Sequence, residues 1–149
     1  MIKDALEETA VAFFAVDIGL TPGPTIVKAD DEPYEPPDAD VTAVIGFTGS
    51  MEGGVHLSAP LHSALALASA FSGEDLTSFE STARDAVGEL TNIIAGAVKS
   101  RISDDIRLTP PYVISGSRLI ISYARSLSSA KCYFRTNKGP FFVEIFYKK

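Results

Sequence analysis

The 149-residue chain lacks the residues that would build a disulfide framework or a nucleic-acid surface. Cys132 is its one cysteine, so no internal disulfide can form, and we expect a protein of the reducing cytoplasm. Its 13 Lys and Arg against 19 Asp and Glu give a net charge of −6, and the basic residues form no cluster. Because nucleic acids and anionic membranes attract basic surfaces, the sequence argues against both as partners.

Long apolar segments are also missing. The run AVAFFAV at residues 10–16 is seven residues long and is flanked by acidic residues. A spanning helix needs about 20 apolar residues, and a secretion signal begins with basic residues and ends at a small-residue cleavage site. We therefore expect the run to belong to an amphipathic helix from Ile2 to about Gly19 that stays in the mature protein.

The rest of the sequence predicts one domain, residues 1–149, with neither an internal repeat nor a linker. In chain order its elements are a short edge strand at 25–28 within a Pro- and Asp-rich stretch, a β-hairpin at 41–59, a helix at 60–71, a long helix at 77–103, strand-like runs at 112–115 and 118–124, and a hairpin at 131–147. Gly73 separates the two helices, and Thr77 with Glu80 has the spacing of a capping box. This order predicts an α+β fold in which helices, including one long central helix, cover one face of a two-layer, largely antiparallel sheet.

The long helix divides into two faces when its residues are placed at 100° per position. One face is apolar and is expected to be buried against the sheet: Phe79, Ala83, Ala86, Val87, Leu90, Ile93, Ile94 and Ala97. The other face gathers five residues within an arc of roughly 80°: Asp85, Glu89, Asn92, Gly96 and Lys99.

The polar face has an ordinary explanation, because solvated helix faces are usually charged. Two of its residues argue for a partner instead. Asn92 is a poor helix former at a mid-helix position where Lys, Glu or Gln would serve solubility better. Gly96 costs about 1 kcal/mol relative to alanine, and its missing side chain lets another surface approach one turn from Asn92. Lys99 is read as a solvated lysine without a role.

The pattern Asp85-x3-Glu89-x2-Asn92, continued by IIAGA, resembles the [S/D]-x3-E-x2-N signature of the CheC/CheX/FliY phosphatase family. The resemblance extends from about residue 41 to the end of the chain. It includes the segments FTGSMEGGVHLS, TPPYVISG and Gly-Pro-Phe-Phe-Val-Glu on either side of the signature helix.

Some members of this family carry a second signature on the first helix. Here Asp4-x3-Glu8 is followed by Val11 where that signature has asparagine. A valine side chain cannot hydrogen-bond a water molecule. The chain therefore resembles the single-signature CheX class.

The resemblance implies a chemotaxis phosphatase that hydrolyses the aspartyl phosphate of a CheY-type receiver domain. The receiver brings its own Mg²⁺ and lysine, so the phosphatase would need no cofactor of its own and no metal site. Asn92 would position the attacking water through its amide, and Glu89 would dock the receiver lysine. Asp85 and Gly96 would contribute to the docking surface, although Asp85 is equally explained as an acid in the first half of a helix. The resemblance also favours a homodimer.

Other chemistry finds little support. His56, His62 and Cys132 lack the spacing of a zinc site. No G-x-S-x-G motif supports nucleophilic catalysis, and the glycine-rich turn at 49–54 lacks the Lys-Ser/Thr of a P-loop. The tail FFVEIFY is expected to be a core strand with alternating burial, or an edge strand that pairs with a second subunit.

Two rival functions stay open at this point. A module of the same fold that binds a receiver or a flagellar-switch component without hydrolysis would show binding and no phosphate release. A structural domain with a merely solvated helix would capture no phosphorylated receiver.

Overall fold

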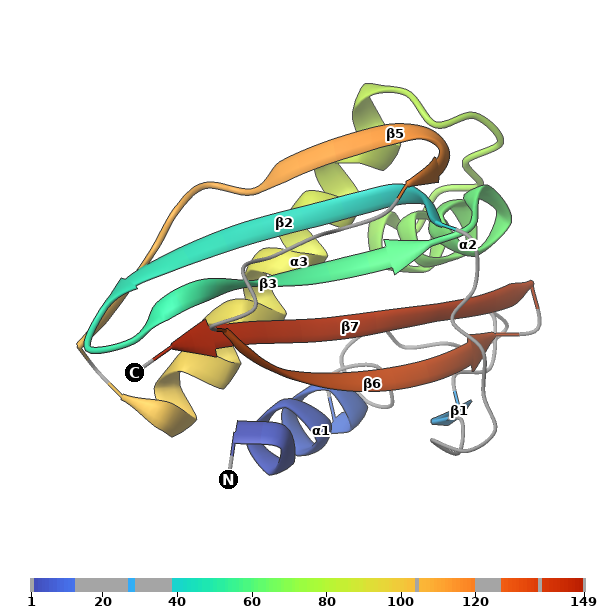
Figure 1. The fold of residues 1–149 in the computed structure, drawn as a ribbon. Coiled ribbons are helices and arrows are strands. Elements are labelled where there is room, and N and C mark those ends of the chain that lie inside the picture. Colours follow the sequence, from blue (N-terminus) through green and yellow to red (C-terminus); the bar gives the residue numbers. More distant parts are fainter. Residues whose placement is uncertain are drawn as a thin grey trace.

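The computed structural model describes residues 2–12, 27–28, 39–103, 105–119, 127–136 and 138–148. These residues form three helices and a seven-stranded sheet, in the order α1 (Ile2–Ala12), β1 (Val27–Lys28), β2 (Ala39–Gly49), β3 (Glu52–Ala59), α2 (Leu61–Ser72), α3 (Ser81–Ile102), β4 (Ile106–Leu108), β5 (Tyr112–Leu119), β6 (Ser128–Thr136) and β7 (Gly139–Lys148). The predicted α+β class is confirmed, because every strand pairing is antiparallel and the helices cover one face of the sheet (Figure 1).

The sheet has the strand order β1-β6-β7-β3-β2-β4, and β5 pairs with β2 as well. Two strands therefore share the outer edge of β2. β4 pairs with the end that holds Phe47, and β5 pairs with the end that holds Val41. Behind this sheet α3 runs diagonally, packed against β2 and β3, and α1 and α2 both lie on the same side of it, α1 against β6 and α2 against β7 (Figure 1).

The predicted hairpin at 41–59 is confirmed as β2 and β3, whose register runs from Val41↔Ala59 to Phe47↔Gly53. The alternation of apolar residues along β2 explains which face of the hairpin is buried. Val41, Ala43 and Ile45 are fully buried toward the helices because side chains of one strand face alternate sides of a sheet.

The helix predicted at 60–71 is confirmed as α2. Pro60 precedes its first turn, where the N–H of Leu61 donates to Asp40 Oδ2 at 2.9 Å. Gly73 ends the helix with φ 75°, a left-handed conformation that glycine adopts without a steric penalty.

The predicted start of the long helix at Thr77 is wrong, because α3 begins at Ser81. Glu80 precedes it with an extended backbone and no capping hydrogen bond from its side chain, so the capping box does not form. The connection is held by α2 instead. The Ser69 hydroxyl accepts from Leu76 N at 3.0 Å and donates to Leu76 O at 3.4 Å, which ties the residue before Thr77 to α2.

The tail segment is confirmed as a core strand, since β7 pairs with β3 on one side and β6 on the other, and the alternative of an edge strand is excluded. One feature of it was predicted wrongly. Its residues Phe141 to Ile145 are all buried, so burial does not alternate along it. β4 was not predicted, because a strand of three residues has no periodicity of its own.

Several other expectations meet the limits of the described residues. α1 is described to Ala12, so its expected continuation to Gly19 lies outside them. The short edge strand at 25–28 is confirmed at Val27–Lys28, where it pairs with β6. In the expected run at 118–124, residues 118–119 end β5 and residues 120–124 lie outside the described part. None of the described helices combines the length and apolar character that crossing a membrane requires.

Candidate functional site

The site predicted from the sequence lies on α3, whose inner face packs against the sheet. Its buried residues follow the helical period: Ala83, Ala86, Val87, Gly88, Leu90, Thr91, Ile94, Ala95 and Val98. This burial fixes the rotation of the helix about its axis. The opposite side therefore projects in a defined direction.

Asp85 and Glu89 are exposed on that opposite side, and Asn92 is half-buried there, as the helical period predicts. Residues three apart on a helix are neighbours, with Cβ atoms about 5–6 Å apart. Toward the described part of the chain, the side chains of these three residues form no hydrogen bond or ion pair. The helix thus presents a carboxylate and an amide side by side with their polar atoms available to another molecule.

Ile93 was predicted to be buried, and this is wrong, because its side chain is 38% exposed. The buried stripe is rotated by roughly 60° from the one expected from large apolar residues. Gly88, Thr91 and Ala95 occupy the sheet-facing positions because small side chains let the helix approach the sheet closely. Counting small residues as core positions would have identified Ile93 as an outward residue.

The two glycines of α3 have opposite surroundings. A Cβ atom at Gly88 would lie 3.3 Å from Val113 Cγ2 and 3.5 Å from Pro111 Cγ, so glycine permits the contact between α3 and β5. A Cβ atom at Gly96 would meet nothing within 4 Å apart from its own helix backbone and chain neighbours. Neither packing nor backbone conformation in the described part requires glycine at Gly96.

Two arginines hold α3 near its ends. Arg84 donates from Nη1 to the Val113 carbonyl at 3.2 Å and from Nη2 to the Ser115 hydroxyl, which joins the helix to β5. Its guanidinium also lies over the Phe79 ring, 5.4 Å from the centroid. Near the other end Arg101 forms an ion pair with Glu8 of α1. These contacts add to the burial of the inner face, which sets the direction of the outward face.

The ion pair between Arg101 and Glu8 also concerns whether α1 could carry a second signature. Asp4 and Glu8 are both exposed on α1, but Glu8 is engaged by Arg101. Together with Val11 at the asparagine position, this leaves α1 without a second acid-and-amide pair.

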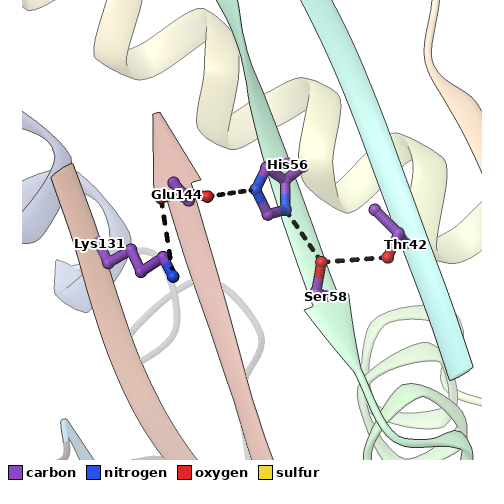
Figure 2. Close-up of polar contacts among 5 residues, drawn as sticks. All are labelled: Thr42, His56, Ser58, Lys131 and Glu144. Atoms are coloured by element: carbon purple, nitrogen blue, oxygen red, sulfur yellow. Dashed lines mark hydrogen bonds and ion pairs between the residues drawn. The ribbon is translucent and has the colours of Figure 1, made fainter. Parts of the chain in front are cut away.

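The two histidines and the cysteine do not lie together in one site. His56 is 1% exposed, and its ring nitrogens bond Ser58 Oγ at 2.9 Å and Glu144 Oε1 at 2.7 Å (Figure 2). His62 is exposed on α2, while Cys132 is buried on β6. Among the described residues no three His, Cys, Asp or Glu side chains are grouped so that they could hold a metal ion. The zinc alternative therefore gains no structural support.

Comparison with known proteins gives a consistent result. The family model described as Chemotaxis phosphatase CheX matches residues 41–135, which is more than half of the chain. The CheY-P phosphatase CheX of Thermotoga maritima is 36% identical over 85 residues, which make up 54% of this chain and 55% of that protein. The chain thus matches about half the length of this relative.

Solved structures share the fold over almost the whole chain. The chemotaxis protein CheX from Desulfovibrio desulfuricans has a TM-score of 0.77 at 26% identity, covering 97% of this chain and 99% of that one. The CheX–CheY–BeF3–Mg²⁺ complex from Borrelia burgdorferi has a TM-score of 0.70 at 22% identity, covering 99% and 96%. The family match and this shared fold agree with the resemblance of the signature helix, and the chain belongs to the CheX family of chemotaxis phosphatases.

Proposed function

We propose that this chain hydrolyses the aspartyl phosphate of a CheY-type receiver domain in chemotaxis signalling. The observation that carries the proposal is the pair Glu89 and Asn92, which lie one turn apart on the outward face of α3 without partners in the described part. The Thermotoga maritima relative is named for this activity, and the Borrelia burgdorferi neighbour was crystallised with CheY.

In this proposal the chain has to supply only one element of the reaction. Water attacks the phosphorus atom in line, the bond between phosphorus and the aspartyl oxygen breaks, and inorganic phosphate leaves an aspartate carboxylate behind. The receiver's own Mg²⁺ neutralises charge on the transferring group, so the chain needs no cofactor of its own. What is missing is a water molecule held in the attacking position.

Asn92 is suited to hold that water. Its amide oxygen can accept a hydrogen bond from the water, and its NH₂ group can donate one to a neighbouring oxygen. Correct positioning of a reactant contributes several kcal/mol to a rate. Because burial of the inner face sets the rotation of α3, the helix carries Asn92 on its outward side.

Glu89 has the docking role in this proposal. Its exposed carboxylate can pair with the ammonium group of the receiver lysine, and such a charge-assisted bond has a preferred geometry. The pair would set how far the helix enters the receiver site. Asp85, one turn earlier on the same face, would lie at the edge of the contact.

The deciding experiment is phosphate release from ³²P-labelled CheY-type receivers of the same genome, with and without this chain. Release above the receiver's own rate supports the proposal. Binding without release would identify a docking module, and an absence of binding would identify a structural domain.

A homodimer belongs to the same proposal. β5 is exposed along almost all of its length, with Tyr112 at 68% and Ile114 at 47%. In the described part no strand pairs with its outer edge. An unpaired edge is a template for another strand, so β5, and not the tail strand, is the segment that would join two subunits.

We place the reaction in the cytoplasm, because one cysteine cannot provide an internal disulfide.

A further inference from the structure

We infer that Ile93 and Gly96 form an apolar contact patch for the receiver beside the catalytic pair, and that this patch determines affinity and not the chemical step. This inference rests on the proposed function, since it concerns the surface that the receiver would meet.

The exposure of Ile93, a large apolar side chain, calls for an explanation. Among the described residues four large hydrophobic side chains are exposed, namely Leu61, Ile93, Tyr112 and Ile114, and Ile93 is the one on α3. It follows Asn92 directly and lies one turn after Glu89. The core does not need it, because Leu90, Thr91 and Ile94 fill the inner side of this turn. A branched residue also disfavours helix relative to lysine or glutamate.

A single exposed isoleucine is common on protein surfaces and by itself indicates nothing. The second observation is Gly96, three residues later on the same side of the helix. A Cβ atom there would contact nothing outside its own helix and neighbours, and the helix would be more stable with alanine. An apolar side chain one turn after Glu89 and a bare backbone one turn after Asn92 thus occur together on this side of the helix.

The occupant we assign to this patch is the receiver domain itself. The patch continues the surface formed by Glu89 and Asn92, because Ile93 lies one turn after Glu89 and Gly96 lies one turn after Asn92. A receiver docked on that pair would therefore also cover the patch. Gly96 then lets the receiver backbone come close without meeting a side chain.

The patch touches the receiver in the ground state and the transition state alike. Interactions of that kind lower KM and Kd and leave kcat nearly unchanged. Asn92 is different, because it acts on the attacking water. The patch and Asn92 can therefore be separated by kinetics.

The test uses Ile93→Gln and Gly96→Ala in the full chain. Steady-state phosphate release gives KM and kcat, and titration of a receiver carrying beryllofluoride and Mg²⁺ gives Kd. We expect KM and Kd to rise about tenfold for Ile93→Gln, which corresponds to about 1.4 kcal/mol, with kcat changed less than about twofold. Gly96→Ala should raise both constants several-fold while the Tm rises by up to about 3 °C, so weaker binding cannot be attributed to a damaged fold.

Leu61→Gln is the matched control. Leu61 is 40% exposed, close to the value for Ile93, and lies at the start of α2. This variant should keep the KM and Kd of the parent chain. The inference is overturned if Ile93→Gln and Gly96→Ala bind the receiver as the parent does, or if they lower kcat at unchanged KM. If the parent chain binds the receiver and releases no phosphate, the proposed function fails, and the Kd values alone decide on the patch.

Discussion

His56 and Glu144 face each other across β3 and β7, with 2.7 Å between Nε2 of the imidazole and Oε1 of the carboxylate. Both side chains are almost fully buried. The row continues from Glu144 to its cross-strand neighbour Lys131 at 3.8 Å, and from His56 through Ser58 of the same strand to Thr42 across the sheet (Figure 2). These residues alternate with core residues such as Val55 and Ile145, so they lie on the sheet face opposite the helices.

We expect Glu144→Ala to lower the free energy of unfolding by about 2–4 kcal/mol, because it leaves His56 buried without its partner and creates a cavity. Urea denaturation followed by circular dichroism measures the loss. Glu52→Ala, an exposed acid on the same β3 strand, should change stability by less than about 0.5 kcal/mol. Equal losses for the two variants would show that the row contributes nothing. Folded Glu144→Ala should keep its phosphatase rate, since α3 lies on the other face.

We expect Asn92→Ala to lower stimulated phosphate release about a hundredfold or more, since alanine cannot hold the attacking water. Its affinity for a receiver carrying beryllofluoride should stay within about threefold of the parent value, below the cost of one hydrogen bond. Thr82→Ala, at an exposed position of the same helix, serves as the control. Full activity in Asn92→Ala would end the water-positioning proposal.

We expect Glu89→Gln to raise KM roughly ten- to a hundredfold, because the amide loses the charge that pairs with the receiver lysine. The parent's KM should increase with added NaCl, and this salt dependence should weaken in the variant. Asp85→Asn should have a smaller effect in the same assay, and Glu74→Gln provides the same change of net charge outside α3. Equal effects of Glu89→Gln and Glu74→Gln would contradict a specific docking role.

The two glycines of α3 give a matched pair for stability. We expect Gly88→Leu to lower the free energy of unfolding by about 1–3 kcal/mol, since its side chain would enter the space of Val113 and Pro111. Gly96→Leu should be neutral or slightly stabilising, because the space there is open. Urea denaturation compares both with the parent chain. The reverse order would mean that the rotation of α3 described above is incorrect.

We expect Ile114→Lys to shift the chain from dimer to monomer, because a lysine on an edge strand opposes pairing with another strand. Sedimentation velocity at several micromolar measures the change. Leu61→Lys adds the same charge at another exposed hydrophobic residue and should leave the dimer intact. A parent chain that sediments as a monomer would reject the homodimer.

Much of this fold could be predicted from the sequence, because local signals agree with tertiary packing. In the β2–β3 hairpin the alternating residues around Val41 and Ile45 face the core, and Gly73 stops α2 where it occurs in the sequence. The outward direction of Glu89 also followed from helical spacing alone.

The errors occurred where distant residues override a local signal. Ser69 of α2 binds Leu76, and α3 begins at Ser81 and not at Thr77, although the capping-box spacing is present. Small residues at the sheet contact rotated the helix and placed Ile93 outside. In β7 the partners of Glu144 come from β3 and β6, so no pattern within the tail itself could reveal burial on both faces.

Anchorage of α3 by Arg84 at β5 and by Arg101 at α1 bears on how a complex would assemble. Burial of its inner face holds the orientation of the helix, so a complex of the kind proposed would form with little change in α3. Rigid-body placement of this chain against a receiver is therefore a sound starting geometry for that complex.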